Sequence, residues 1–234
     1  HARETLAPVA YEALLRARDE NNRPISPEAA FALPQTQDDI VFFDRLCRVV
    51  HALNFVAQAG NSPDLYVNVS GAHLLNVSAG GHGKIFETLL MYCGLTPQRI
   101  VLEIVESRVD SLPHLQEAIT AYKERGYRVA IDDFGCQHSN FDRLWQLTPD
   151  IVKLDRSLIL QASDNARARR ILPKLIDIIH DLGALAVCEG IETVQQHDLA
   201  QGAGADLLQG YYYSMPRASL QHVPACLTAS GESP

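Results

Sequence analysis

The stretch YRVAIDDFG, residues 127–135, combines an apolar run with two adjacent aspartates. Its first part, Arg128 to Ile131, has the composition of a buried strand, and Asp132 and Asp133 follow where that strand ends. Two neighbouring carboxylates repel each other unless a cation lies between them or one of them is protonated. Aspartate is also common in solvated turns. Two interpretations of this pair therefore stay open, a metal site or a simple turn.

The overall composition is that of a globular protein with a sizeable core. The chain has 234 residues, of which 47% are hydrophobic and 21% are charged. Its formal net charge of −8 argues against electrostatic binding of a nucleic-acid polymer. An anionic substrate would approach an acidic cleft only where metal ions reverse the local field.

The cysteines predict a reducing compartment. They are odd in number, scattered and without a CxxC pair, which favours free thiols over a disulfide framework. No apolar run is long enough to cross a bilayer, and no signal peptide is recognisable. We expect a cytoplasmic protein, or the cytoplasmic domain of a larger, membrane-tethered one. The five cysteines are Cys47, Cys93, Cys136, Cys188 and Cys226.

Short apolar runs alternate with longer amphipathic stretches along the chain. The pattern predicts strands over residues 9–15, 65–69, 100–105, 128–131, 151–154, 185–188 and 206–208. It predicts helices over residues 38–59, 83–93, 115–125, 166–182 and 194–201.

This alternation predicts an α/β fold with a parallel sheet, and seven or eight such units favour a closed (β/α)8 TIM-like barrel. The alternative, an open doubly wound sheet, lacks its glycine-rich GxGxxG turn after any predicted strand. No linker or break in composition divides the chain. We therefore expect a single domain over residues 1–234, with a polar C-terminal tail from about residue 217.

Polar residues stand at or near the ends of the predicted strands, which is where barrel enzymes carry their chemistry. Each has an ordinary structural explanation when taken alone. Together they place several oxygen ligands and one lysine on a single rim, and oxygen ligands without cysteine or histidine favour Mg²⁺ or Mn²⁺. The metal interpretation of the aspartate pair now outweighs the turn. These residues are Glu12, Arg16, Asn68, Glu103, Glu106, Asp132, Asp133, Lys153, Asp155, Glu189, Glu192 and Gln209.

Seven motifs in a fixed order also carry a family resemblance. They are EALLR from Glu12, VNVS from Val67, LEIVES from Leu102, AIDDFG from Ala130, VKLDRS from Val152, CEGIET from Cys188 and QGYYYSMP from Gln209. Over nearly its whole length the chain resembles the EAL domain family of cyclic-di-GMP phosphodiesterases.

The resemblance implies hydrolysis of cyclic-di-GMP to linear 5′-pGpG by a water that two metal ions, Mg²⁺ or Mn²⁺, activate. It also implies a homodimer that is fused to, or regulated by, other signalling modules. One ion would be held by Glu12, Asn68, Glu103 and Asp132. The second would be held by Asp132, Asp133 and Glu189.

Other matched positions receive roles in catalysis or substrate binding from the same resemblance. Lys153 would contact the attacking water, Glu189 would also serve as proton acceptor, and Glu106 would support the loop after the paired aspartates. Substrate binding would involve Leu14, Arg16, Asp155, Glu192 and Gln209.

The chain departs from the family pattern at two places. After the aspartates the family reads DDFGTGYSS, whereas this chain reads DDFGCQHSN, residues 132–140. A glycine position with positive φ would be costly for Gln137. A catalytically weak cyclic-di-GMP receptor therefore stays open as the alternative function. The family also has a strand before the EAL motif, and only HARETLAPVA precedes the motif here, so we expect a missing or atypical first strand.

Overall fold

The computed structural model describes residues 1–59, 63–71, 74, 82–105, 111–136 and 141–220. Seven strands form one curved sheet in which all neighbours pair in parallel. In sheet order they are β1 (Ala10–Ala13), β4 (Asp64–Asn68), β5 (Ile100–Ile104), β6 (Arg128–Phe134), β7 (Ile151–Leu154), β8 (Leu185–Cys188) and β9 (Leu207–Leu208).

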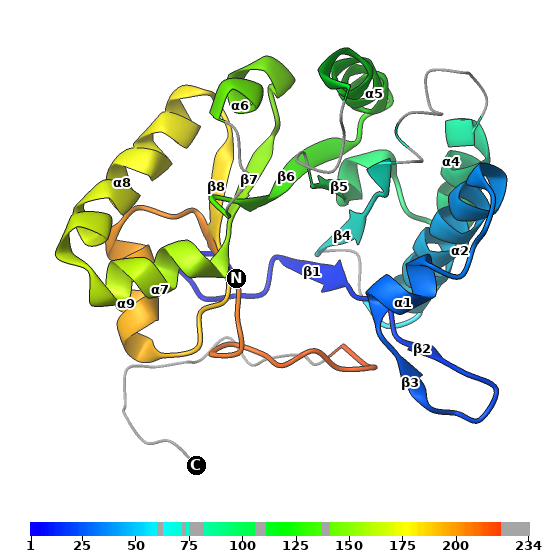
Figure 1. The fold of residues 1–234 in the computed structure, drawn as a ribbon, viewed down its shortest axis with the longest axis horizontal. Coiled ribbons are helices and arrows are strands. Elements are labelled where there is room, and N and C mark those ends of the chain that lie inside the picture. The colour runs from blue at the N-terminus through cyan, green and yellow to red at the C-terminus, as the bar shows by residue number, and fades with distance from the viewer. Residues whose placement is uncertain (60–62, 72–73, 75–81, 106–110, 137–140, 221–234) are drawn as a thin grey trace.

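Helices lie around the outside of this sheet, as Figure 1 shows. They are α1 (Pro27–Phe31), α2 (Gln37–Val56), α4 (His82–Tyr92), α5 (Leu112–Glu124), α6 (Phe141–Leu147), α7 (Arg156–Asp164), α8 (Ala166–Asp181) and α9 (Val194–Gly202). A short 3-10 helix, η1 (Pro97–Arg99), precedes β5, and a two-stranded hairpin, β2 (Ala17–Arg18) with β3 (Pro24–Ile25), follows β1.

Polar caps define where several of these helices begin. The side chains of Thr36, Asp155 and Asn165 accept backbone N–H groups in the first turns of α2, α7 and α8. At α9, Thr193 and Gln196 satisfy each other's backbone groups in a capping box. These caps fix the points at which the chain turns from the sheet into its outer layer.

The curved sheet curls into a ring whose two edge strands are β1 and β9. At the β9 edge, the N-terminal residues take the place of a further strand. Ala2 forms an isolated antiparallel bridge with Leu207, and the backbone N–H of Leu208 donates to the carbonyl of His1 at 2.9 Å. The first two residues thus occupy the place beside β9. This agrees with the expectation of an atypical first strand.

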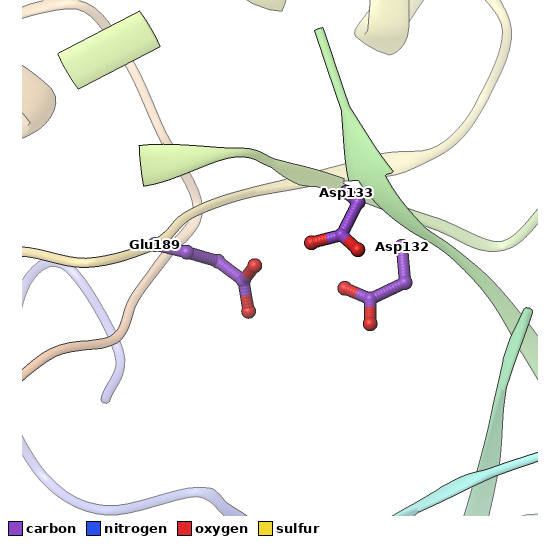
Figure 2. A group of neighbouring side chains, drawn as sticks. All are labelled: Asp132, Asp133 and Glu189. Carbon is purple, nitrogen blue, oxygen red and sulfur yellow. The ribbon is translucent and has the colours of Figure 1, made fainter. Parts of the chain in front are cut away.

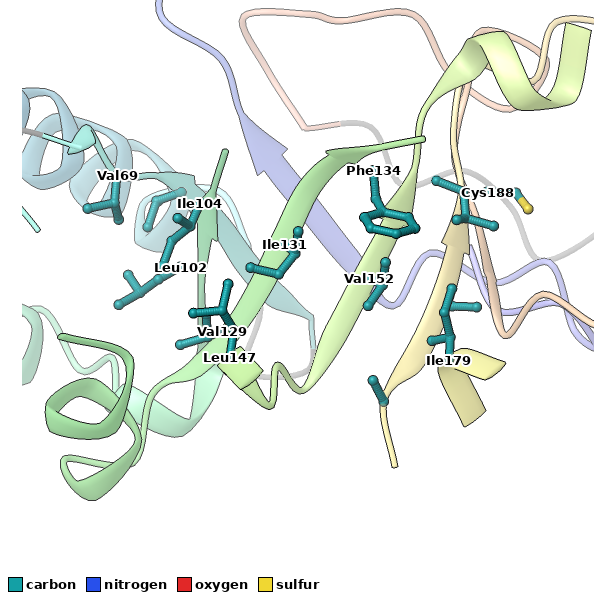
Figure 3. Packing of buried hydrophobic residues seen from close by; sticks show 14 of the residues in the cluster. Val69, Leu102, Ile104, Val129, Ile131, Phe134, Leu147, Val152, Ile179 and Cys188 are labelled. Atoms are coloured by element: carbon teal, nitrogen blue, oxygen red, sulfur yellow. The ribbon is translucent and has the colours of Figure 1, made fainter. Parts of the chain in front are cut away.

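Two apolar layers follow from the alternation of side chains along the strands. One faces the helices, and Figure 3 shows part of it, with Leu102, Val152 and Ile179 buried between sheet and helices. The other lies on the opposite face, inside the ring. It contains Tyr66, Val101, Ala130, Ile151 and Val187, with Ala10 and Leu207 packed against them.

The structure confirms the α/β fold with a TIM-like barrel architecture. The five predicted helices are present with slightly shifted ends. Helices α1 and α6 and the β2–β3 hairpin were not predicted, because each is short and carries little periodic signal; helix α7 was not predicted either.

Candidate active site

The inward-facing layers of the ring build the site. The apolar inner layer takes one residue from each strand: Ala10, Tyr66, Val101, Ala130, Ile151, Val187 and Leu207. Two positions further along every strand, and therefore on the same face, stands a polar residue. These seven residues are Glu12, Asn68, Glu103, Asp132, Lys153, Glu189 and Gln209.

Lys153 lies at the centre of this polar layer and is 1% exposed. Its ammonium contacts Glu103, and it lies 2.8 Å from Glu189 Oε1 and 3.0 Å from Asp132 Oδ1. Glu12 Oε2 is more distant, at 3.5 Å. Burial by itself would lower the pKa of Lys153, but the four surrounding carboxylates raise it well above its ordinary value. The lysine is therefore charged at the centre of the site.

One ammonium does not balance four carboxylates. Burial raises the pKa of Glu103 well above its ordinary value, although Lys153 opposes this shift. Burial likewise raises the pKa of Glu189 to about 7, again against Lys153. Both shifts show that the ionised carboxylates are held at a cost in the absence of further positive charge.

The adjacent aspartates reach the same side of the sheet through a β-bulge. The pairing of β6 with β7 shifts by one residue at this point, so that Asp132 and Asp133 lie opposite the single residue Lys153. Asp133 has a φ of 55°, in the left-handed region that ordinary side chains avoid. The usual alternation of side chains between the two faces of a strand is therefore interrupted here. Because of the bulge, both carboxylates converge.

Three carboxylates fit a divalent cation. Asp132, Asp133 and Glu189 each offer an oxygen, and these oxygens lie within 4.8 Å of one another. Figure 2 shows the two aspartates side by side, with Glu189 extending toward them from the end of β8, two strands away in the sheet. Glu103 Oε1 and Asp132 Oδ1 are buried close to this group, and each contacts the Lys153 ammonium. Such an all-oxygen set suits Mg²⁺, Mn²⁺ or Ca²⁺ better than zinc.

The remaining inward residues are held by hydrogen bonds. Gln209 Nε2 donates to Glu12 Oε2 at 2.6 Å, and Asn68 Nδ2 donates to Glu103 Oε2 at 3.3 Å. Gln209 was predicted as a substrate contact, and in the structure it orients Glu12. The structure thus brings together every metal ligand that the sequence predicted, while their roles stay predictions.

Leu14 and Arg16 lie at the rim, beyond Glu12. Leu14 is 41% exposed and lines a cavity of about 200 Å³ together with Glu12 and Gln209. Arg16 is exposed, and its guanidinium donates to the carbonyl of Leu15 at 2.9 Å. Both side chains are therefore accessible from the mouth of the site.

Asp155 and Glu192 support the framework around the site. Asp155 Oδ1 accepts the N–H of Ser157 at 3.0 Å and caps α7. Glu192 forms an ion pair with Arg156 at 2.9 Å. A predicted substrate role for either residue stays a prediction. Glu106 lies outside the described residues.

Arg156 is a site-supporting residue that the sequence did not reveal. Gly190, next to Glu189, has a φ of 65°, and a Cβ there would overlap the aliphatic stem of Arg156. Arg156 therefore lies across the loop after β8 and ties it to α7 through Glu192. No local pattern predicts this contact, because it joins the start of α7 to the loop after β8, and these segments are distant in the sequence.

Comparison with known proteins decides the family. The EAL domain matches residues 3–216, which is most of the chain. The chain belongs to the EAL domain family. The cyclic di-GMP phosphodiesterase PdeL of Escherichia coli K12 is 30% identical over 148 residues, covering 61% of this chain and 41% of PdeL. This EAL family therefore includes cyclic di-GMP phosphodiesterases, as the motifs predicted.

Two solved EAL structures share the fold. A standalone EAL protein from Vibrio cholerae O395, in its c-di-GMP-bound form, has a TM-score of 0.79 at 26% identity, covering 92% of this chain and 89% of that one. The Bacillus subtilis YkuI protein, in complex with c-di-GMP and calcium, has a TM-score of 0.78 at 25% identity, covering 94% and 54%.

The chain matches only part of the length of its relatives. The chain spans less than half the length of PdeL and of comparable curated relatives. Among the described residues, no helix combines the length and apolar character needed to cross a membrane. The four described cysteines are free thiols, in line with the cysteine pattern.

Proposed function

We propose that this EAL domain hydrolyses one phosphodiester bond of cyclic-di-GMP and releases linear 5′-pGpG, with two divalent ions, Mg²⁺ or Mn²⁺, in its site. The observation that carries the proposal is the polar layer of the ring. Four carboxylates surround Lys153, and Asp132, Asp133 and Glu189 converge within 4.8 Å. An excess of buried negative charge of this kind is stable only with cations.

The two ions would share Asp132. One set of ligands is Glu12, Asn68, Glu103 and Asp132, and the other is Asp132, Asp133 and Glu189. When bound, the ions would acidify the attacking water and stabilise negative charge on the phosphoryl oxygens.

The chain's own groups would position the nucleophile and move its proton. Lys153 is charged and fixed by its carboxylate contacts, so its ammonium can hold the attacking oxygen in place. Glu189, which lies 2.8 Å from the Lys153 ammonium, would accept the water proton. The water oxygen bonds to phosphorus, the P–O3′ bond breaks, and the 3′ oxygen leaves and takes up a proton.

The substrate would lie across the open mouth of the ring. Arg16 is exposed beside that mouth and offers a guanidinium to a phosphate, and Leu14 offers an apolar surface to a guanine base. Gln209, between the rim and Glu12, would contact the substrate while orienting that glutamate. Glu106 is proposed to support the loop after the aspartates, and Asp155 and Glu192 to complete the substrate-facing surface.

A catalytically weak cyclic-di-GMP receptor is the second candidate. It is favoured by the CQHSN sequence after Gly135, of which residues 137–140 lie outside the described part of the chain. The ligand residues that would bind cyclic-di-GMP are the same in both functions. The two candidates differ only in the rate of bond cleavage.

One experiment separates them. Metal-free protein is incubated with cyclic-di-GMP and Mn²⁺ or Mg²⁺, and pGpG is quantified by chromatography, beside a binding titration in Ca²⁺ and a control in EDTA. We expect pGpG in Mn²⁺ or Mg²⁺ and none in EDTA. Binding without product would establish the receptor instead. Absence of product in Mn²⁺ and Mg²⁺, together with absence of binding in Ca²⁺, would overturn both functions.

The domain bounds, the cellular location and the assembly of the protein are also proposals. We propose that residues 1–234 form one EAL domain that acts in the cytoplasm as a homodimer, within or beside other signalling modules. The match over residues 3–216 supports the domain assignment.

A further inference from the structure

A buried ion pair lies on α2, outside the polar layer of the ring. Arg48 Nη2 is 2.7 Å from Asp44 Oδ2, and both side chains are 2% exposed. The guanidinium of Arg48 also lies over the ring of Phe86, at 5.0 Å from its centroid. Replacing a buried pair by apolar residues is often neutral or stabilising, so stability alone does not account for two charges at this place.

The second oxygen of the Asp44 carboxylate reaches the sheet. Asp44 Oδ1 accepts the backbone N–H of Ser70 at 3.0 Å. Ser70 is two residues beyond Asn68, the last residue of β4, whose side chain bonds Glu103. The carboxylate therefore links α2 directly to the turn that carries a proposed metal ligand.

A cavity separates the helix from this turn. Its volume is about 330 Å³, and its lining includes Asp44, Arg48, Asn68 and Ser70. Close packing, which fixes most strand ends, is therefore reduced on this side of the turn. A hydrogen bond to a charged carboxylate is stronger than one to a neutral acceptor, so its contribution matters more where packing is reduced.

We infer that Asp44 is a positioning residue for the metal site, and that Arg48 holds its carboxylate in place. Through Ser70, Asp44 fixes the turn after β4, so that the Asn68 amide stays beside Glu103, where both residues would hold the proposed ion. This inference rests on the proposed function, because it assigns Asn68 to a bound ion. Partners one step removed from a metal ligand typically change metal affinity by about 10–100-fold.

Two double variants isolate the hydrogen bond to Ser70. D44N/R48Q replaces the ion pair by two neutral amides and keeps a carbonyl oxygen that can accept the Ser70 N–H. D44L/R48M has a similar volume and no charge, but it offers Ser70 no acceptor. Both variants lose the ion pair, and their main difference is the acceptor that position 44 offers to the Ser70 N–H.

The first measurement is Mn²⁺ affinity by calorimetry on metal-free protein, with folding checked by circular dichroism. D44L/R48M should bind Mn²⁺ about tenfold more weakly than the wild type, and D44N/R48Q within about twofold of it. A merely structural role would change the melting temperature of the two variants without separating their affinities. Equal affinities in the two folded variants would overturn the inference.

A second measurement uses the wild-type protein and does not depend on the folding of a variant. Coupling between two sites is reciprocal, so saturating Mg²⁺ should slow hydrogen exchange at the Ser70 amide. The amide of Ile179, a buried residue of α8, serves as the reference. An unchanged exchange rate at Ser70, in a protein that binds Mg²⁺, would reject the role of Asp44. If the wild type binds neither ion, the proposed function itself fails.

Discussion

The two sides of the ring hold their site residues in different ways. On the β6–β7–β8 side, Asp132, Lys153 and Glu189 contact one another directly. On the β1–β4 side, Glu12 and Asn68 depend on neighbours, since Gln209 orients Glu12 and Asp44 holds the turn that follows Asn68. One side is fixed by opposite charges, and the other by supporting hydrogen bonds.

The strands explain this difference. Both β6 and β7 are buried along nearly their whole length, and the bulge presents two carboxylates to one lysine. By contrast, β1 is only partly buried and lies at one edge of the sheet, and β4 ends in the exposed Asn68. A partly buried edge strand leaves its polar residue less constrained, so an outside partner has to orient it. Substitutions on the two sides should therefore affect different properties of the protein, and by different amounts.

The largest effect is expected where the two sides meet, at Asp132. D132N removes a charge that contacts Lys153 and that both proposed ions share, so pGpG formation at saturating Mn²⁺ should fall by at least about 100-fold. Product is measured by chromatography under single-turnover conditions.

The control for D132N is D150N, which changes an aspartate at the opposite end of the neighbouring strand. Asp150 pairs with Lys123 at 2.9 Å, far from the polar layer. D150N should keep its turnover within about threefold of the wild type, the scale of a surface pair. Turnover near the wild-type rate in D132N would contradict the proposal that both ions share Asp132 as a ligand.

The next effect concerns the charge balance on the β6–β7–β8 side. K153M leaves Glu103, which has no side-chain exposure, beside other carboxylates without its cation. In EDTA the free energy of unfolding should fall by about 3–5 kcal/mol, and added Mn²⁺ should restore more stability to K153M than to the wild type. Urea unfolding with and without Mn²⁺ measures both quantities.

Lys123 provides the matched control for K153M. Its ion pair with Asp150 is about one-third exposed, so K123M should lose at most about 1 kcal/mol, with no dependence on Mn²⁺. The charge-balance account would be wrong if K153M in EDTA were as stable as K123M.

The sequence predicted the β6–β7–β8 side of the ring better than the β1–β4 side. Asp132, Lys153 and Glu189 follow apolar runs, and a charge embedded in such a run is informative because burying it is costly. The sequence also contains a regular spacing: each polar residue stands two positions after an inward-facing apolar one, as Glu103 does after Val101. Because side chains alternate along a strand, this period of two places the polar residues on one face of the sheet.

The features that were not predicted depend on contacts between distant segments. The strand predicted to end at Ile131 continues to Phe134, because β7 resumes pairing after the bulge. The left-handed conformation of Asp133 and the contact of Arg156 with Gly190 arise in the same way. Helix α7 is different, because Asp155 is an ordinary N-cap whose local signal was assigned to substrate binding instead.

A smaller effect is expected on the β1–β4 side, where support is indirect. Q209A removes the donor to Glu12 but no proposed ligand, so the Mn²⁺ concentration for half-maximal turnover should rise about tenfold. Turnover at saturating Mn²⁺ should change less. Q146A removes an exposed glutamine on α6 and should leave both values unchanged. A loss of turnover in Q209A that Mn²⁺ does not restore would place Gln209 in the chemistry itself.

The smallest effect concerns the bulge that brings the carboxylates of the β6–β7–β8 side together. Asp133 has a φ of 55°, which costs a residue other than glycine about 1–2 kcal/mol. D133N keeps that conformation while it removes a charge from the cluster, whereas D133G removes the charge and also relieves the strain. Glycine loses about 0.5–1 kcal/mol through its greater freedom in the unfolded chain, so D133G should exceed D133N by about 0.5–1 kcal/mol in urea unfolding with EDTA. Both variants should bind Mn²⁺ more weakly than the wild type. Equal stabilities would mean that β7 holds Asp133 without strain, and the bulge would then be a relaxed feature of the sheet.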